Sequence, residues 1–242
     1  MHQHLYAHLL LALYFALMAS PLHSATPQQP DSTDDVGALL WLPRISGTTA
    51  HVVAPTSSDP TSSATISIAR HELLQSWQGG NVTLRLISDD KLGEGFVISY
   101  KAADHSAVVS AHRPIGLLYG SYALLRWQST SDEQHADTSW SSVPALQRRM
   151  LNHWDNPDGS VERGYAGRSI WKWEQVTKNG MTDSLRQRLT IYARANASVG
   201  INATVVNNVN ASPKMVTRPY LEKLKVIADL LRPYGIDRKS VV

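Results

Sequence analysis

The sequence predicts an α/β fold in which a small N-terminal α/β domain is followed by the beginning of a (β/α)8 TIM barrel. Helical and strand-like patterns are mixed in residues 37–130, whereas strand, loop and helix alternate strictly from residue 148 onward. Only 95 residues, 148–242, are left for the second region. Because a closed barrel typically needs ~250 residues, we expect a truncated barrel.

The first 25 residues have the pattern of a signal peptide. Leu9–Ser20 is a continuous apolar run, too short to cross a bilayer comfortably, and the small residues Ser24 and Ala25 follow it. The alternative is a buried core helix, and the leader contains no Lys or Arg. We expect cleavage near Ala25, export to the periplasm or the extracellular space, no membrane anchor after cleavage, and a disordered lead-in over residues 26–36.

Residues 37–130 are expected to form the N-terminal accessory domain. Residues 37–43 are a plausible strand, and residues 81–88, 95–102 and 106–112 are three more. One helix is predicted over residues 64–80, ending in a left-handed conformation at Gly79-Gly80, and a second over residues 113–128. Gly116 and Gly120 would let the second helix pack closely on a mixed sheet, with both helices on one face. The expected core positions of the helices are Ile66, Ala69, Leu73, Leu74 and Trp77, then Leu118, Tyr122 and Leu125.

Residues 131–147 are polar and rich in serine, and are expected to be a linker. The incomplete barrel, residues 148–242, then begins with a strand at 148–154. A helix at 182–200 is capped by Thr182 or Asp183, and a strand at 201–211 follows. A second helix is predicted at 217–235, closed by Gly235, with Ser240–Val242 at the start of a third strand. The expected core residues of these helices are Leu185, Leu189, Tyr192 and Ala195 or Asn196, then Leu221, Leu224, Ile227, Ala228 and Leu231.

Composition narrows the possible functions. The chain has no cysteine, which excludes disulfides, thiolate catalysis and cysteine-based zinc sites. Residues 1–147 carry 7 Lys/Arg and 12 Asp/Glu, whereas residues 148–242 carry 16 and 8. The basic region suits an anionic partner such as an acidic sugar, unless its acidic complement lies outside the chain. Nucleic acid is disfavoured because the basic residues are scattered and the protein is expected to be exported.

One loop, NHWDNPDGSVERGYAGRSIW at residues 152–171, combines aromatic, charged and glycine residues. It follows the first barrel strand, and a second polar segment, NNVNASP, follows the next strand. Active-site residues of βα barrels lie at the C-terminal ends of strands. A sugar site needs flat apolar surfaces for ring faces and polar groups for hydroxyls, so this composition favours carbohydrate binding.

LNHWDNPDGSVERGYAGRSIW and YARANASVGINATVVNNVNA together resemble the first two βα units of the α-glucuronidase family of glycoside hydrolases. LGEGFVISY and RPIGLLYGSYALLR are similar to that family's N-terminal domain. The resemblance implies inverting acid/base removal of (4-O-methyl-)glucuronic acid from glucuronic-acid-substituted xylooligosaccharides, with two opposed carboxylates. It places those catalytic carboxylates downstream of Val242. It implies no metal or cofactor. The full-length enzyme is expected to be either a monomer or a homodimer.

Seven residues are candidate substrate-binding residues. The resemblance places Trp154 and Val209 in the uronic-acid pocket; the alternatives are a buried core tryptophan and ordinary valine packing. The residues themselves suggest that Asn207 and Asn208 present amides to hydroxyls or cap a loop, and that Arg163 meets the uronate carboxylate or pairs locally. Asp155 and Glu162 are expected to orient Arg163 and His153 or to bind hydroxyls. A catalytic role is the less favoured alternative, because an acid and a base need opposed placement.

Other residues of the loop have structural interpretations. Asn156-Pro157-Asp158-Gly159 is a β-turn sequence, so we expect Asp158 to be structural. Tyr165 and Trp171 are expected to pack. His153 with Asp155 or Glu162 is only a weak metal signal, and we assign no metal. The competing hypotheses to a hydrolase fragment are a non-catalytic uronic-acid- or xylan-binding module and an inactive gene remnant.

Overall fold

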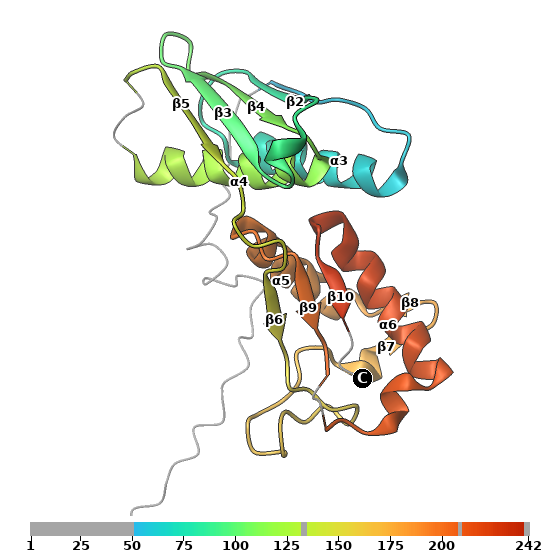
Figure 1. Ribbon diagram of the computed structural model, residues 1–242. Helices are drawn as coiled ribbons and strands as arrows, with labels where there is room; N and C mark the ends of the chain where they lie inside the picture. The colour runs from blue at the N-terminus through green and yellow to red at the C-terminus, as the bar shows by residue number, and fades with distance from the viewer. Residues whose placement is uncertain (1–50, 132–134, 208–209, 240–242) are drawn as a thin grey trace, which may run out of the picture. The chain divides into compact units, whose positions relative to one another are not determined.

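The computed structural model describes residues 51–131, 135–207 and 210–239, all within one compact unit, Val36–Val242. The first layer is a five-stranded sheet in the order β1-β2-β4-β3-β5, flanked by two helices on one face (Figure 1). Strands β1, β2 and β4 are parallel, and β3 runs antiparallel to both β4 and β5, so the sheet is mixed as predicted. The elements are β1 (Val52–Val53), α3 (Pro60–Ser76), β2 (Val82–Leu86), η1 (Asp90–Leu92), β3 (Phe96–Lys101), β4 (Ser106–Ala111), α4 (Pro114–Thr130) and β5 (Thr138–Ser142).

Two glycines explain how closely α4 approaches this sheet. A Cβ atom at Gly120 would overlap Val109 and touch Phe96, and one at Gly116 would overlap the backbone of Gly95. Leu118, Tyr122 and Leu125 of the same helix are buried in the core that this packing creates. The expected close packing of α4 on the sheet is therefore confirmed.

The end of α3 differs from the expectation. The helix stops at Ser76 with Trp77 in an extended conformation, and neither Gly79 nor Gly80 has a positive φ angle. These glycines are instead required by space, because a Cβ at Gly79 would overlap the Trp77 ring and one at Gly80 would overlap the Asp104 carbonyl. The glycine pair thus lets the backbone pass close to the ring of the buried Trp77 and to the Asp104 carbonyl. The prediction of a left-handed helix end was wrong.

The expected linker at residues 131–147 is also partly structured. Residues 138–142 form β5, which pairs with residues 96–100 of β3 at the edge of the first sheet. The strand is polar and mostly exposed on both faces, so it lacks the apolar alternation that reveals a half-buried strand.

The second layer is a parallel sheet in the order β10-β9-β6, formed by two consecutive strand–helix–strand connections (Figure 1). Helix α5 connects β6 to β9, and α6 connects β9 to β10. The third strand starts at Asp237, earlier than predicted, and Ser240–Val242 lie outside the described residues. The elements are β6 (Met150–Asn152), η2 (Trp173–Gln175), β7 (Val176–Thr177), β8 (Gly180–Met181), α5 (Asp183–Ser198), β9 (Ala203–Val205), η3 (Pro213–Val216), α6 (Arg218–Leu231), η4 (Arg232–Tyr234) and β10 (Asp237–Lys239).

The caps and buried faces of these helices follow the sequence. Thr182 caps α5 by accepting a hydrogen bond from the Leu185 amide, and Gly235 has the positive φ expected after α6. Leu224, Ile227 and Leu231 are buried, but Leu221 is 46% exposed. The prediction that Leu221 is a core residue was therefore wrong; it lies in the first turn of α6.

A buried ion pair connects the helix layer of the first sheet to the second sheet. Arg194 of α5 donates hydrogen bonds to the Glu72 carboxylate of α3, from Nε to both oxygens at 2.7 and 2.9 Å and from Nη2 to Oε2 at 2.7 Å. The Tyr122 hydroxyl donates to the same carboxylate at 3.3 Å. Both charged side chains are less than a tenth exposed. Thr65 of α3 also donates to the Pro233 carbonyl at 2.7 Å, which adds a second contact between α3 and the second layer.

No helix in the described part of the chain is long and apolar enough to cross a membrane. The expected signal peptide, the lead-in over residues 26–36 and the strand at residues 37–43 all lie outside the described residues.

Replacing Arg194 with Met should destabilise the protein by about 3–5 kcal/mol, because the Glu72 carboxylate would remain buried with only the Tyr122 hydroxyl as a partner. The double variant Glu72→Leu/Arg194→Met should recover most of this loss, since it buries no charge. Urea unfolding of both variants checks this, and equal stability of the single and double variants would contradict it.

Candidate functional site

The loop that follows β6 is held by its own backbone. Isolated β-bridges join Asp155 to Val161 and Ser160 to Arg168. The Gly159 amide donates to the Asn156 carbonyl at 3.1 Å, closing the predicted β-turn. The Asp158 carboxylate accepts hydrogen bonds from the Ser160 amide and hydroxyl, at 2.9 and 2.6 Å. Asp158 is therefore a structural turn residue.

A cluster of His153, Trp171, Tyr192 and Thr204 anchors this loop to the neighbouring elements. His153 Nε2 and the Tyr192 hydroxyl share a hydrogen bond of 2.9 Å, and the same hydroxyl lies 2.9 Å from Thr204 Oγ1. The Trp171 ring packs edge-on against both the His153 and Tyr192 rings, with centroids 5.1 and 5.4 Å apart. Because Tyr192 is on α5 and Thr204 on β9, the cluster fixes the end of β6 to its two neighbouring elements.

Asp155 faces into this cluster. The residue is 3% exposed, and its Oδ1 atom lies 3.9 Å from His153 Nδ1. Its Oδ2 atom and Trp171 Nε1 are buried without a hydrogen-bond partner among the described residues. This placement suits a carboxylate that orients His153, which is one of the two roles expected for it.

Trp154 points away from the cluster. Of the residues on either side of it, His153 belongs to the cluster and Asp155 faces into it, whereas Trp154 itself is 40% exposed. Its carbonyl accepts a hydrogen bond from the Glu162 amide at 2.6 Å, which closes the loop around it. Its exposure excludes the alternative of a buried core tryptophan and leaves an indole surface at the C-terminal end of β6.

The remaining candidates are placed as follows. Glu162 is half-buried and has a left-handed backbone conformation, with φ of 56°. Arg163 next to it is exposed. Asn207 follows β9 and is only 3% exposed, so it is part of the packed strand end. Asn208 and Val209 lie outside the described residues.

Two aromatic residues of the loop behave differently. Trp171 is fully buried, as expected for a packing residue, but Tyr165 is 75% exposed and does not pack. Tyr192 was expected only as a core residue, and its part in the hydrogen-bond network was missed. The available signal was Thr204, a hydroxyl residue in the middle of an apolar strand that needs a polar partner when buried.

Burial controls the protonation of the cluster. It lowers the pKa of His153, an effect that the nearby Asp155 carboxylate opposes only in part. It raises the pKa of Tyr192, although the hydrogen bond with Thr204 acts in the opposite direction. At neutral pH the cluster therefore contains a neutral imidazole and a neutral phenol. Within the described residues, no group of three or more His, Asp or Glu side chains is placed to hold a metal ion.

The fold has a counterpart among solved structures. A GH138 enzyme targeting pectin rhamnogalacturonan II superposes with a TM-score of 0.53 at 15% sequence identity, covering 79% of this chain and 24% of that one. The arrangement of a mixed sheet followed by parallel βα units is thus also found in that enzyme.

Sequence comparison identifies similar proteins. Residues 128–241 match the model of the glycosyl hydrolase family 67 middle domain. The chain is 37% identical over 150 residues to alpha-glucuronidase A of Emericella nidulans and 35% identical over 150 residues to the alpha-glucuronidase of Hypocrea jecorina. Each match covers 60% of this chain and 17% of the relative, so the chain corresponds to a small part of these proteins. The resemblance to the α-glucuronidase family is confirmed.

The pKa of His153 predicts a pH dependence of stability. Because the folded pKa lies below the ordinary value of 6.5, the unfolded chain binds more protons between the two values. Stability from this group is present above pH ~6.5 and falls as the pH is lowered through that range. His153→Gln should reduce this part of the pH dependence, measured by urea unfolding at pH 5 and pH 7.5. A histidine signal assigned to His153 that titrates above pH ~6.5 would contradict the assignment.

Proposed function

We propose that this chain is part of a xylan α-glucuronidase. In this proposal, β6, β9 and β10 are the first three strands of a (β/α)8 barrel, and residues 37–142 belong to the preceding accessory domain. The parallel order of the three strands and the α-glucuronidase relatives support the proposal. The exported location expected from the leader is part of the same proposal, since polymeric xylan lies outside the cell.

The observation that carries the proposal is the placement of Trp154. Its indole is exposed at the C-terminal end of β6, which is the end at which barrel enzymes bind their substrates. An indole provides a flat apolar face for a sugar ring and an N–H donor for a hydroxyl. The exposed guanidinium of Arg163, on the same loop, has the geometry to bind a uronate carboxylate with two hydrogen bonds.

The proposed reaction is hydrolysis with inversion of the anomeric carbon. One carboxylic acid protonates the leaving oxygen while an opposed carboxylate activates water, about 6.5–9.5 Å away. Two of the three carboxylates of this loop have other roles, since Asp155 is buried against His153 and Asp158 accepts hydrogen bonds from Ser160. The third, Glu162, cannot serve as both the acid and the opposed base. We therefore assign catalysis to carboxylates of the intact enzyme outside these residues, and expect the 242-residue chain alone to bind substrate fragments without cleaving them.

A non-catalytic uronic-acid-binding module is the second candidate. The exposed Trp154 favours this candidate equally. It differs from the hydrolase in that it needs no catalytic carboxylates. The two candidates are separated by the activity of the intact protein, because only the hydrolase releases glucuronic acid from a glucuronic-acid-substituted xylooligosaccharide.

Trp154→Ala should weaken binding of glucuronic-acid-substituted xylotriose to the chain about tenfold, because the stacking face is lost. Isothermal titration calorimetry measures this. Tyr165→Ala is the matched control, since it removes another exposed aromatic side chain from the same loop and should leave the affinity unchanged. Equal affinities of Trp154→Ala and the unmodified chain would contradict the proposed pocket.

A further inference from the structure

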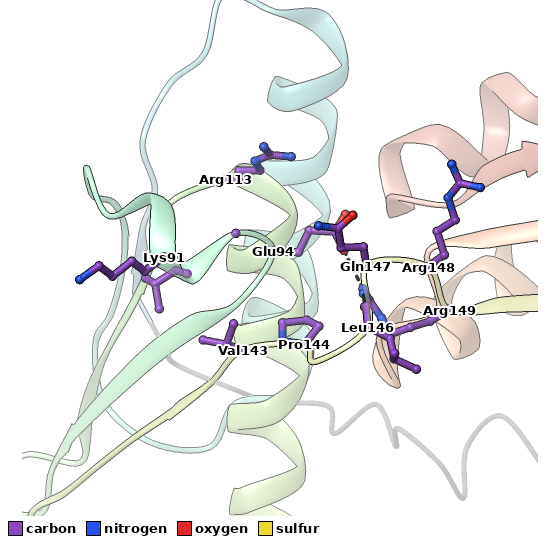
Figure 2. A pocket seen from close by; sticks show the side chains of 11 residues that line it. Lys91, Glu94, Arg113, Val143, Pro144, Leu146, Gln147, Arg148 and Arg149 are labelled. Atoms are coloured by element: carbon purple, nitrogen blue, oxygen red, sulfur yellow. Dashed lines mark hydrogen bonds and ion pairs between the residues drawn. The ribbon is translucent and has the colours of Figure 1, made fainter.

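A second candidate site lies at the other end of β6. A cavity of about 510 Å³ is formed by η1, the start of α4 and the segment that leads into β6 (Figure 2). Arg148 and Arg149 precede β6, whereas Trp154 follows it. At roughly 3.3 Å per residue of strand, this places the cavity on the order of 15 Å from Trp154 along the chain. The lining residues are Lys91, Leu92, Gly93, Glu94, Arg113, Val143, Pro144, Leu146, Gln147, Arg148 and Arg149.

The lining has an excess of positive charge. Its single carboxylate, Glu94, is already engaged by Arg149 at 2.6 Å and by the Asn202 amide at 3.1 Å. Arg149 is fixed further by hydrogen bonds to the carbonyls of Gly200 and Leu146, at 2.5 and 2.6 Å. The Glu94–Arg149 pair is therefore a neutral, rigid part of the wall.

The other three cations of the lining are available to a ligand. Within the described ranges, Lys91, Arg113 and Arg148 form no ion pair or side-chain hydrogen bond. Figure 2 shows Arg113 and Arg148 on either side of Glu94 and Gln147, with Lys91 farther away beyond Glu94. Arg113 is also the N-cap residue of the 17-residue helix α4, so the positive end of the helix dipole adds to the charge of this wall.

The opposite wall is apolar. Val143, Pro144 and Leu146 lie together below Glu94 and Gln147 in Figure 2. The cavity thus has cations and the Gln147 amide on one side and an aliphatic surface on the other. This lining suits an anion that also has a flat apolar face. An acidic sugar has this chemistry, because its carboxylate matches an arginine fork and its ring face packs on proline and aliphatic side chains.

We propose that this cavity is a second binding site for an acidic sugar, separate from the Trp154 surface. Arg113 and Arg148 bind the carboxylate, Gln147 binds a hydroxyl group, and Val143 and Pro144 contact the ring. The sugar class rests on the proposed function, but the position and charge of the cavity do not. On a xylan carrying several glucuronic acid branches, this site would hold one branch while the Trp154 surface receives another.

The test is a titration of the 242-residue chain, carrying Trp154→Ala to remove the first site, with sodium glucuronate. Backbone amide spectra recorded by NMR should show shifts at Gly93, Gly95 and Gln147. Adding Arg113→Gln and Arg148→Gln should weaken this binding about tenfold or more. The matched control is Arg85→Gln with Arg188→Gln, which removes two exposed arginines outside the cavity and should leave the affinity unchanged.

Glucose and inorganic phosphate are the comparison ligands. Glucose should not shift these signals, and phosphate should bind more weakly than glucuronate because it has no ring face. Equal binding of phosphate would overturn the assignment to a sugar, and unchanged affinity in the Arg113/Arg148 variant would overturn the site. Failure of the proposed function gives a different result, which a parallel titration of the chain with Trp154 intact detects. The cavity signals would then still shift, whereas the indole N–H signal of Trp154 would not.

Discussion

The buried Glu72–Arg194 ion pair is the interaction on which the arrangement of this protein depends. Burial lowers the pKa of Arg194, but the hydrogen bonds and charge of Glu72 more than offset this, so its pKa is raised and the guanidinium stays charged. Two charges removed from water are tolerated only with such a partner. Because Glu72 is on α3 and Arg194 on α5, the pair fixes the helix that packs under the first sheet to the first helix of the βα units.

This constraint reaches the candidate site through α5. Tyr192 lies two residues before Arg194 and shares hydrogen bonds with His153 and Thr204. His153 in turn directly precedes Trp154, whose exposed indole is the surface that we assign to sugar binding. Helix α3 therefore acts on the site through α5: Glu72 holds Arg194, Tyr192 of the same helix holds His153, and Trp154 next to His153 stays exposed.

Features set by local chemistry were predictable from the sequence, including the Thr182 cap, the Asp158 turn, the buried faces of α3 and α4, and the close approach at Gly120. Features set by partners distant in the chain were not. Strand β5 lacks apolar alternation and exists because β3 presents an open edge. The roles of Tyr192, and of Glu72 with Arg194, depend on contacts between separate elements, which residue periodicity does not encode.

A crystal structure of the chain with glucuronic-acid-substituted xylotriose bound tests the role of Trp154 most directly. We expect a glucuronic acid ring stacked on Trp154 at the C-terminal end of β6, with His153 still hydrogen-bonded to Tyr192. A structure in which Trp154 is packed in the interior, or in which the ligand is clearly bound elsewhere and no sugar touches Trp154, would contradict the assignment of Trp154 to sugar binding.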